Sequence, residues 1–195
     1  MKEIIFFSNN KNKIIEISNF FVEKSLKILD LNNFDKIISP NEIGNTFEEN
    51  AKIKSLHGYK IFNKICFADD SGICIEALDG KPGVHSKNFL KNNKNAYNAC
   101  REILSITRNK NNFNAFFQTS ICLSLNEKKH IFFNGKIVGK ISKEIKGKSG
   151  FGYDPIFIPE GYNKTFAEMK PEQKNSISHR SIAIKKLKGY LLKLI

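Results

Sequence analysis

The sequence contains no tryptophan, and only three of its 32 basic residues are arginine (Arg101, Arg108 and Arg180). The remaining basic residues are lysines scattered along the chain, and with 19 acidic residues they leave a formal net charge of +13. A protein that grips nucleic acid would more often cluster arginine in a stripe, because its planar fork makes two-point contacts with phosphates and guanine. We therefore interpret the charge as a solvated basic surface and expect no specific nucleic-acid partner.

Cysteine and long apolar runs are also scarce. The four cysteines (Cys66, Cys74, Cys100 and Cys122) form no C-x-x-C pair and have no zinc-site spacing, so we expect free, mostly buried thiols. No apolar run approaches the roughly 20 residues that a membrane span needs. These absences predict a cytoplasmic protein with no membrane partner.

What the chain does have is enough apolar material for a core. Of its 195 residues 41% are hydrophobic, and 17 are phenylalanine, which excludes intrinsic disorder. A length of this order predicts a single domain over residues 1–195, or two closely merged lobes within it.

Apolar runs and apolar residues at helical spacing predict alternating strands and helices. Thr46 and Glu49 form a capping-box pattern, so a helix should begin there and run to about Asn63. The expected strands are 2–7, 26–31, 65–68, 73–78, 113–125 and 130–141, the last two paired antiparallel. Three other helices are expected: one that carries Ile14, Ile15, Phe21 and Val22, one over 96–104 and one over 183–194. The expected loops are 79–88 and 147–161.

A polar turn between the first strand and the first helix is a candidate phosphate site. It consists of Ser8, Asn9, Asn10, Lys11, Asn12 and Lys13. Backbone N–H groups at a helix N-terminus attract anions, and Lys13 would add a charge. The alternative is a plain helix cap, since Ser and Asn are common capping residues.

Two adjacent aspartates, Asp69 and Asp70, follow an apolar strand, where α/β sheets present ligand-binding groups. A hard cation such as Mg²⁺ would compensate their charges. Because successive strand side chains point to opposite faces, only one aspartate need face the ligand. The alternative is an Asx turn that closes a hairpin at Ser71 and Gly72.

A glycine-rich stretch carries an aromatic pair beside a carboxylate: Phe151, Gly152, Tyr153 and Asp154. An aromatic face there could stack on a base, and the carboxylate could accept from ring N–H groups. The alternative is an aromatic plug at the end of a sheet.

Three basic residues, Lys174, His179 and Arg180, precede the expected last helix. Positive charge near the positive end of a helix dipole is mildly unfavourable and therefore invites an anion.

Taken in order along the chain, these motifs resemble those of the inosine triphosphate pyrophosphatase family. The matching segments are 8–13, 68–72 (Ala-Asp-Asp-Ser-Gly), 80–84, 150–157, 164–169 and 178–180 (Ser-His-Arg), and they span nearly the whole length. The resemblance implies Mg²⁺-dependent hydrolysis of ITP, dITP and XTP to the monophosphate and pyrophosphate, which cleanses the nucleotide pool. It also implies an elongated mixed sheet flanked by helices, two merged lobes with the active-site cleft between them, and a homodimer.

The resemblance further assigns roles to individual residues. It places Ser8, Asn10 and Lys13 on the triphosphate within the turn 8–13, with Lys54 as another phosphate contact. Asp70 becomes the catalytic, metal-linked carboxylate, Glu42 the other acidic metal ligand, Ser71 a substrate contact, and Asp69 a support behind them. Phe151 stacks on the purine, Gly152, Tyr153 and Asp154 line the base pocket, and Lys174, His179 and Arg180 reach the base and sugar edge.

Asn9 and His85 depart from the pattern, because the family commonly has Gly and Tyr there. Asn tolerates a left-handed turn, so Asn9 should be harmless. Lys87 is a further candidate phosphate contact. Two other functions stay open: a basic RNA-binding or nucleotide-binding module without catalysis, and a related pyrophosphatase that prefers modified pyrimidines.

Overall fold

The computed structural model describes residues 2–21 and 26–194. The strands are β1 (Lys2–Phe6), β2 (Leu26–Asp30), β3 (Cys66–Ile75), β4 (Asn114–Ser124), β5 (His130–Ile141) and β6 (Phe157–Pro159). The helices are α1 (Lys11–Ser18), α2 (Phe47–Phe62), α3 (Ser86–Asn92), α4 (Ala96–Asn109), α5 (Pro171–Ile177) and α6 (His179–Leu194).

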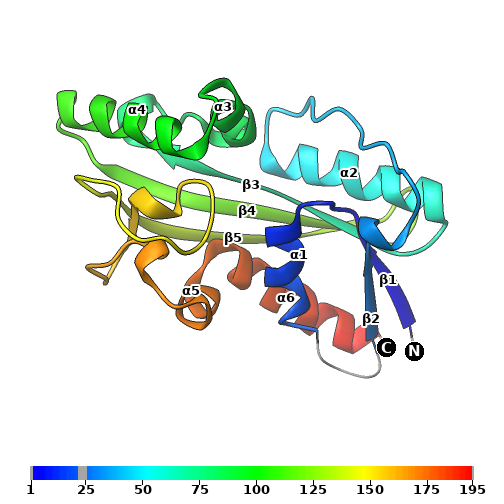
Figure 1. The fold of residues 1–195 in the computed structure, drawn as a ribbon. Helices are drawn as coiled ribbons and strands as arrows, with labels where there is room; N and C mark the ends of the chain where they lie inside the picture. Colours follow the sequence, from blue (N-terminus) through cyan, green and yellow to red (C-terminus); the bar gives the residue numbers. More distant parts are fainter. Residues whose placement is uncertain (1, 22–25, 195) are drawn as a thin grey trace. The chain divides into compact units, whose positions relative to one another are not determined.

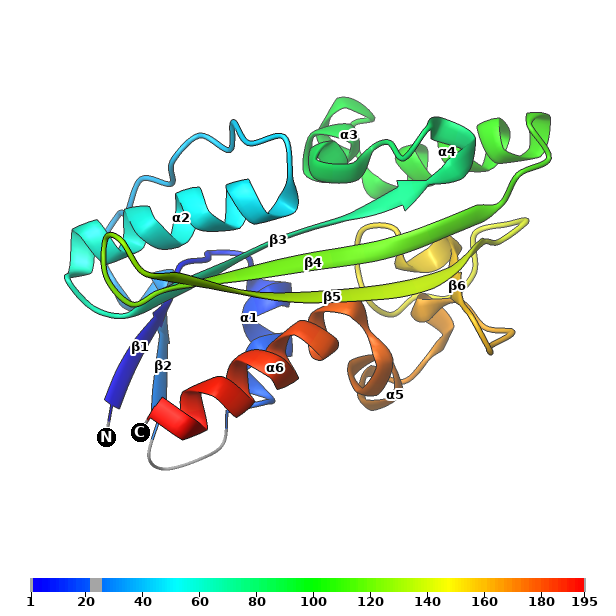
Figure 2. The ribbon, with the colours of Figure 1, turned by 180° about the vertical axis from the view of Figure 1, so that it is seen from behind.

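The strands form one mixed sheet in the order β2, β1, β3, β4, β5, β6 (Figure 1, with β6 labelled in Figure 2). Strand β1 pairs in parallel with β2 and β3, whereas β5 and β6 are antiparallel. The predicted α/β class, a mixed sheet flanked by helices, is therefore confirmed. The chain divides into two compact units, the first comprising 1–70, 119–135 and 180–195, and the second 71–118 and 136–179.

In the first unit, helices cover both faces of the sheet: α2 lies on one face, and α1 and α6 lie on the other (Figure 2). The alternation along β1 shows how the strands serve both faces. Ile4 and Phe6 join the core cluster with Leu187 of α6, whereas Ile5 joins the cluster with Tyr59 of α2. Parallel strands buried on both faces are expected to be apolar, as Ile4, Ile5 and Phe6 of β1 are, whereas Glu3 near the start of the strand is charged.

Helix α2 begins where the sequence predicts. The Thr46 hydroxyl accepts a hydrogen bond from the Glu49 backbone N–H (3.1 Å), and the Glu49 carboxylate accepts one from the Thr46 N–H (3.3 Å). The helix ends at Phe62, and the following Asn63 takes a left-handed conformation with φ 49°. The capping box is thus confirmed, and it sets the first turn of the helix that carries Asn50 and Lys54.

The second unit has its own core. Buried residues of α4, including Cys100 and Ile103, pack with Ile73 and Ile75 of β3 and with Phe157 of β6. Because the apolar residues of α4 recur every three or four positions, the helix has one buried face and leaves the other to solvent.

Strand β3 corrects the sequence analysis. The sequence predicted a break between strands at 65–68 and 73–78, and one interpretation of that break was a hairpin at 69–72. Both are wrong, because β3 runs without interruption from Cys66 to Ile75. Gly72 serves close packing instead of a turn: a Cβ there would lie 2.2 Å from the Gly83 carbonyl oxygen and 2.4 Å from Ser86 Oγ. The Ser86 hydroxyl accepts from the Ile73 N–H (3.0 Å) and ties this segment to the strand.

Other boundaries also differ. Helix α1 ends at Ser18, so Phe21 lies beyond it, and the predicted helical position Val22 falls outside the described residues. The expected loop 79–88 contains the start of α3, and β6 and α5 arise in segments where no element was expected. These elements are short, and short elements carry too few residues for a hydrophobic period to show.

Strands β4 and β5 are neighbours joined by the turn 125–129, in which the Leu125 N–H donates to the Lys129 carbonyl, as the sequence predicts. All four cysteines are free and buried, which confirms that expectation. Within 2–21 and 26–194, no helix has the length and apolar character needed to cross a membrane.

Candidate active site

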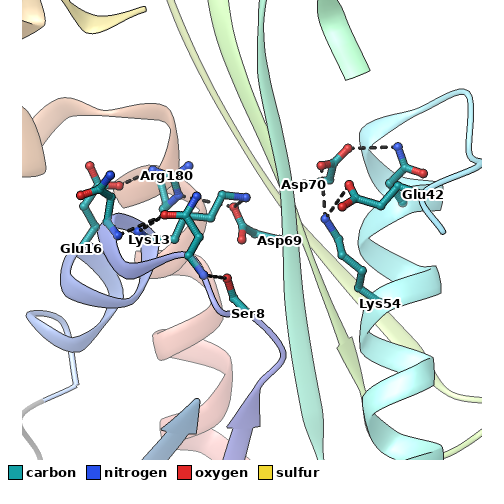
Figure 3. A network of polar contacts seen from close by, with 11 residues as sticks. Ser8, Lys13, Glu16, Glu42, Lys54, Asp69, Asp70 and Arg180 are labelled. Atoms are coloured by element: carbon teal, nitrogen blue, oxygen red, sulfur yellow. Dashed lines mark hydrogen bonds and ion pairs between the residues drawn. The ribbon is translucent and has the colours of Figure 1, made fainter. Parts of the chain in front are cut away.

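Strand β3 carries two charge clusters in the first unit, one on each of its faces (Figure 3). On the face of α1 and α6, the Asp69 carboxylate contacts Lys13 Nζ at 2.9 Å and Arg180 Nε at 3.4 Å. Arg180 also pairs with Glu16 of α1. The Asp69 side chain is 1% exposed, so both of its cations are held in a nearly dry environment.

On the opposite face, the Asp70 carboxylate points toward α2 (Figure 3). Lys54 Nζ lies 3.3 Å from Asp70 Oδ1 and 3.0 Å from Glu42 Oε2, so one amine bridges two carboxylates. The Asn50 side-chain amide donates to the other Asp70 oxygen at 3.2 Å. The alternation of the strand therefore separates the two adjacent aspartates, as expected for β-structure.

The two aspartates have opposite pKa directions. Burial acts to raise the pKa of the Asp69 carboxyl, but the Lys13 and Arg180 charges outweigh it and hold that pKa well below its usual range. Burial also raises the pKa of the Asp70 carboxyl, and the upward direction persists because the nearby lysines oppose it only in part. Asp70 is the carboxylate whose charge is less completely compensated.

The pKa values of the two lysines also shift in opposite directions, downward for Lys13 and upward for Lys54. Burial lowers the pKa of the Lys13 amine, and the attraction of Asp69 offsets this only in part. Burial also acts to lower the pKa of Lys54, but Asp70 and Glu42 together outweigh it, so that pKa is raised. Lys54 is therefore firmly cationic between its two carboxylates.

The turn 8–13 forms the N-terminus of α1 and is both a cap and a cluster of polar groups. The Asn10 side-chain oxygen accepts from the backbone N–H groups of Asn12 (3.1 Å) and Lys13 (3.3 Å), and Ser8 Oγ accepts from the Asn10 N–H (3.2 Å). The capping alternative is thus correct for Asn10. Positive φ angles among the described non-glycine residues occur only at Asn63, Asp79, Lys94 and Asn111, so Asn9 does not use the left-handed region.

Exposure separates the remaining residues of this turn. Asn9, Lys11 and Asn12 are exposed, whereas Lys13 is half-buried, with its amine at Asp69. Ser71 follows Asp70 on β3, is half-buried, and begins the second unit.

The second unit contains the other group of predicted residues. The Asp154 carboxylate accepts from Lys174 Nζ at 2.7 Å and from the Phe151 backbone N–H at 2.8 Å through the same oxygen. Lys174 Nζ also lies 4.7 Å from the centre of the Phe151 ring, within cation–π range. Asp154 therefore holds both the aromatic loop and the lysine beside it.

Glycine is required at position 150 in this loop. Gly150 has φ +75°, and a Cβ there would lie 2.1 Å from the Asp154 carboxylate. The Phe151 ring remains half-buried, whereas Tyr153 is 3% exposed and donates its hydroxyl to the Ser86 carbonyl at 2.8 Å. The aromatic-plug alternative therefore describes Tyr153, and Phe151 is the ring left accessible for stacking.

The basic residues near the last helix are placed differently from the prediction. Lys174 lies on α5, while His179 and Arg180 are the first residues of α6. His179 stacks on Phe117 with a ring separation of 4.7 Å and an angle of 8°. The anions that this cluster was expected to attract include protein carboxylates, Asp154 for Lys174 and Glu16 for Arg180.

Three polar residues in these clusters were not singled out from the sequence: Glu16, Asn50 and Ser86. Glu16 lies three residues after Lys13 on α1, so helical spacing could have placed both on one face. Asn50 lies four residues before Lys54 on α2, and the same spacing would have paired them. Ser86 gives no such signal, because its partners in β3 are far away in sequence.

The donor set around Asp70 suits a hard cation. Asp70 and Glu42 supply carboxylate oxygens that already converge on one positive atom, Lys54 Nζ. In the described part of the chain, no group of three or more His, Cys, Asp or Glu side chains could hold a metal by itself. Two carboxylates completed by substrate phosphates and waters are the usual arrangement for Mg²⁺, which seldom has an all-protein cage.

Comparisons with known proteins agree on one family. A model of the Ham1 family matches residues 4–190. The chain is 43% identical over 185 residues to the dITP/XTP pyrophosphatase of Flavobacterium psychrophilum, covering 95% of this chain and 96% of the other. It is 40% identical over 193 residues to the dITP/XTP pyrophosphatase of Porphyromonas gingivalis, covering 98% of each. The structure of a HAM1 protein from Coxiella burnetii is similar, with TM-score 0.91, 34% identity, and coverage of 99% of this chain and 100% of that one.

Proposed function

Because the chain belongs to the Ham1 family, we propose that it hydrolyses the deaminated purine nucleoside triphosphates ITP, dITP and XTP to the monophosphate and pyrophosphate, and so cleanses the nucleotide pool. The names of the similar dITP/XTP pyrophosphatases support this substrate class. The observation that carries the reaction type is the convergence of two carboxylates, those of Asp70 and Glu42, on a single cation, Lys54 Nζ.

Magnesium is the cofactor that we propose. Asp70 and Glu42 would hold it, with the phosphate oxygens of the substrate completing its shell. When bound, the ion would neutralise charge on the phosphate chain and favour departure of pyrophosphate. The requirement is tested by chelation with EDTA and restoration with Mg²⁺.

Asp70 has the properties of the residue that acts on water. Its raised pKa brings the carboxyl closer to neutral pH, where a general base is more effective. Asp70 orients or deprotonates a water whose oxygen bonds to the α-phosphorus. The anhydride bond to the β-phosphate breaks, and pyrophosphate leaves with the bonding electrons.

The lysines act by charge. Lys13 and Lys54 are positioned by Asp69 and Asp70 respectively, and we assign both to the phosphate chain. Fixed charges of this kind stabilise a transition state without reorganisation, because the protein has already oriented them. Ser8 and Asn10 cap the N-terminus of α1 and so hold the turn from which Lys13 extends.

We assign the base to the Asp154 cluster. Phe151 stacks on the purine, and Asp154 and Lys174 meet its edge. The 6-position of hypoxanthine is an oxo acceptor, whereas adenine has an amino donor there, so a donor from His179, which belongs to the same unit as the Asp154 cluster, would leave ATP unpaired. Mismatches of this type can discriminate by about 10⁴-fold.

The protein is also proposed to be a cytoplasmic homodimer, on the basis of its family resemblance. Sedimentation equilibrium of the purified chain tests the dimer, and a monomer across the micromolar range would reject it.

The decisive experiment for the activity is an assay on ITP, XTP, GTP and ATP with and without Mg²⁺, with separate detection of pyrophosphate and orthophosphate. Pyrophosphate from ITP and XTP alone is the expected result. Orthophosphate as the released product would reject cleavage at the α-phosphorus. Inactivity on all four would favour the enzyme for modified pyrimidines or the binding module.

A further inference from the structure

A cavity lined by charged and aromatic side chains lies beside α4, wholly within the second unit. Its volume is about 590 Å³, and its walls include Tyr97, Arg101, Leu104 and Arg108 of α4, together with Glu144 and Ile145 of the segment after β5. Cavities that hold small molecules commonly have volumes of about 300–1,000 Å³. None of these residues belongs to the Asp70 or Asp154 clusters.

The distribution of arginine makes this cavity unusual. The chain uses lysine at nearly every basic position and arginine at only three. Arg180 is buried against Asp69 and Glu16, and both of the others, Arg101 and Arg108, line this cavity. A guanidinium fork differs from a lysine amine by binding phosphate through two parallel hydrogen bonds.

Helical spacing aligns the relevant side chains. Tyr97, Arg101 and Arg108 lie four and seven residues apart on α4, which places them on one face. At about 1.5 Å of rise per residue, Tyr97 and Arg101 are separated by about 6 Å along the axis, and the two arginines by about 10 Å. This is the scale of a nucleotide, whose base and phosphate can contact side chains one to three turns apart.

Of the side chains that line the cavity, Arg108 is held in place and Tyr97 is accessible to a ligand. The Arg108 guanidinium donates to the Lys143 carbonyl, which holds it against the segment after β5. The Tyr97 side chain is 59% exposed, which leaves its aromatic ring accessible for stacking. An anchored fork and an open aromatic ring are the two elements that contact phosphate and base.

The carboxylate in the cavity does not cancel its positive charge. Glu144 pairs with Lys146 at 3.0 Å, and this hydrogen bond raises the pKa of the Lys146 amine. Glu144 is thus balanced by a cation outside the cavity wall, and the charges of Arg101 and Arg108 remain in excess.

We propose that this cavity is a second nucleotide site, which binds a nucleoside monophosphate with its base against Tyr97 and its phosphate held by Arg101 and Arg108. Stacking on a tyrosine accepts any base, because every base has a π-face. The site should therefore bind adenine nucleotides, which the proposed catalytic pocket rejects.

AMP is the probe for this site. We expect AMP added to the full-length protein at physiological salt to shift the backbone amide NMR signals of 96–109 and 142–146 saturably, with a Kd of about 1 mM or tighter. Arg101→Lys retains the charge and removes the fork, so it should weaken AMP binding about tenfold. Tyr97→Leu should weaken it to a similar extent by removing the stacking ring.

Lys110→Gln is the matched control, because Lys110 is an exposed basic residue at the C-terminal end of the same helix and does not line the cavity. It should change AMP affinity less than about twofold, as expected for one screened surface charge. Pyrophosphate release from ITP should be the same in all three variants. Because AMP binding is measured directly by NMR, that result does not depend on whether the proposed activity is correct.

Three outcomes would overturn the proposal. The first is no saturable shift at 96–109, and the second is an equal loss of affinity in Arg101→Lys and Lys110→Gln. The third is binding of a short single-stranded RNA through the same residues much more tightly than AMP, which would identify a nucleic-acid strand as the occupant.

Discussion

Asp69 and Asp70 are adjacent in the chain, but they lie on opposite faces of β3 and in different electrostatic surroundings. On the Asp69 face, two cations, Lys13 and Arg180, contact one carboxylate. On the Asp70 face, one cation, Lys54, is shared by two carboxylates, Asp70 and Glu42. The pKa of Asp69 is lowered and that of Asp70 is raised, so identical side chains acquire different chemistry from the number of cations that each receives.

This difference separates a structural role from a chemical one. A buried carboxylate with full compensation is stabilised in one geometry and has little capacity left for a ligand. A carboxylate whose negative charge is not fully balanced by neighbouring cations attracts an incoming cation or proton, which is the property of a metal ligand or a base. The following predictions test that division.

The largest expected effect is the loss of turnover in Asp70→Asn. The amide retains the size and some hydrogen bonding of the carboxylate but removes its charge, so kcat for ITP should fall by about 10³-fold or more. Pyrophosphate release measures kcat, and the urea midpoint checks that folding is preserved. Asp35→Asn, at an exposed aspartate of the same unit, is the control and should have normal turnover. Wild-type turnover in Asp70→Asn would exclude this residue as the catalytic carboxylate.

Asp69→Asn should act mainly on stability. It leaves Lys13 and Arg180 near a neutral amide, and breaking a buried ion pair by removing one partner costs about 3–5 kcal/mol. Urea unfolding measures this loss. Glu3→Gln provides the matched control, because Glu3 also contacts two cations, Lys27 and Lys64, but at the surface, where solvent screens the pairs and the loss of stability should be much smaller. Equal stabilities of the two variants would contradict the structural role of Asp69.

Lys54→Met should lower the stability of the protein and make that stability depend on magnesium. Without the amine, Asp70 and Glu42 repel each other, and we expect a destabilisation of about 2 kcal/mol, or roughly 4–8 °C in Tm for a chain of this size. Addition of Mg²⁺ should recover more of the Tm in this variant than in the wild type. Lys52→Met, at an exposed lysine on the same helix, should show neither effect. The role of Lys54 would be rejected by a variant whose Tm is unchanged and insensitive to Mg²⁺.

The smallest expected effect concerns the helix that carries Asn50 and Lys54. Thr46→Ala removes the capping hydroxyl of α2 and should destabilise the protein by about 1 kcal/mol, while Thr46→Ser should retain most of the stability. Because the cap lies at the start of the helix and does not contact Asp70, kcat should change less than about twofold. A larger loss of kcat than of stability would show that the cap positions the site.

Local patterns predicted the parts of the fold that local physics determines. The capping box at Thr46 and Glu49 fixes the start of α2, and the alternation of strand side chains places Asp69 and Asp70 on opposite faces. The turn 8–13 and the stretch 150–154 were identified because their residue types are informative over a few positions.

Distant contacts explain what the sequence did not predict. A strand seemed to end at Asp69 because two adjacent charges are costly in a sheet, yet β3 continues, since the compensating cations come from α1, α2 and α6. Likewise, Gly72 suggested a turn, but it is required by the close approach of Gly83 and Ser86. Such compensation joins residues far apart in the chain, which no local pattern reveals.

The most direct test of the division between the two faces is a crystal structure with Mn²⁺ in place of Mg²⁺ and an ITP analogue that carries a non-hydrolysable link between the α- and β-phosphates. We expect an anomalous peak bonded to the carboxylates of Asp70 and Glu42, with Asp69 still paired to Lys13 and Arg180. A peak bonded to Asp69, or an analogue bound with Asp70 and Glu42 still paired to Lys54 and no metal beside them, would contradict the account.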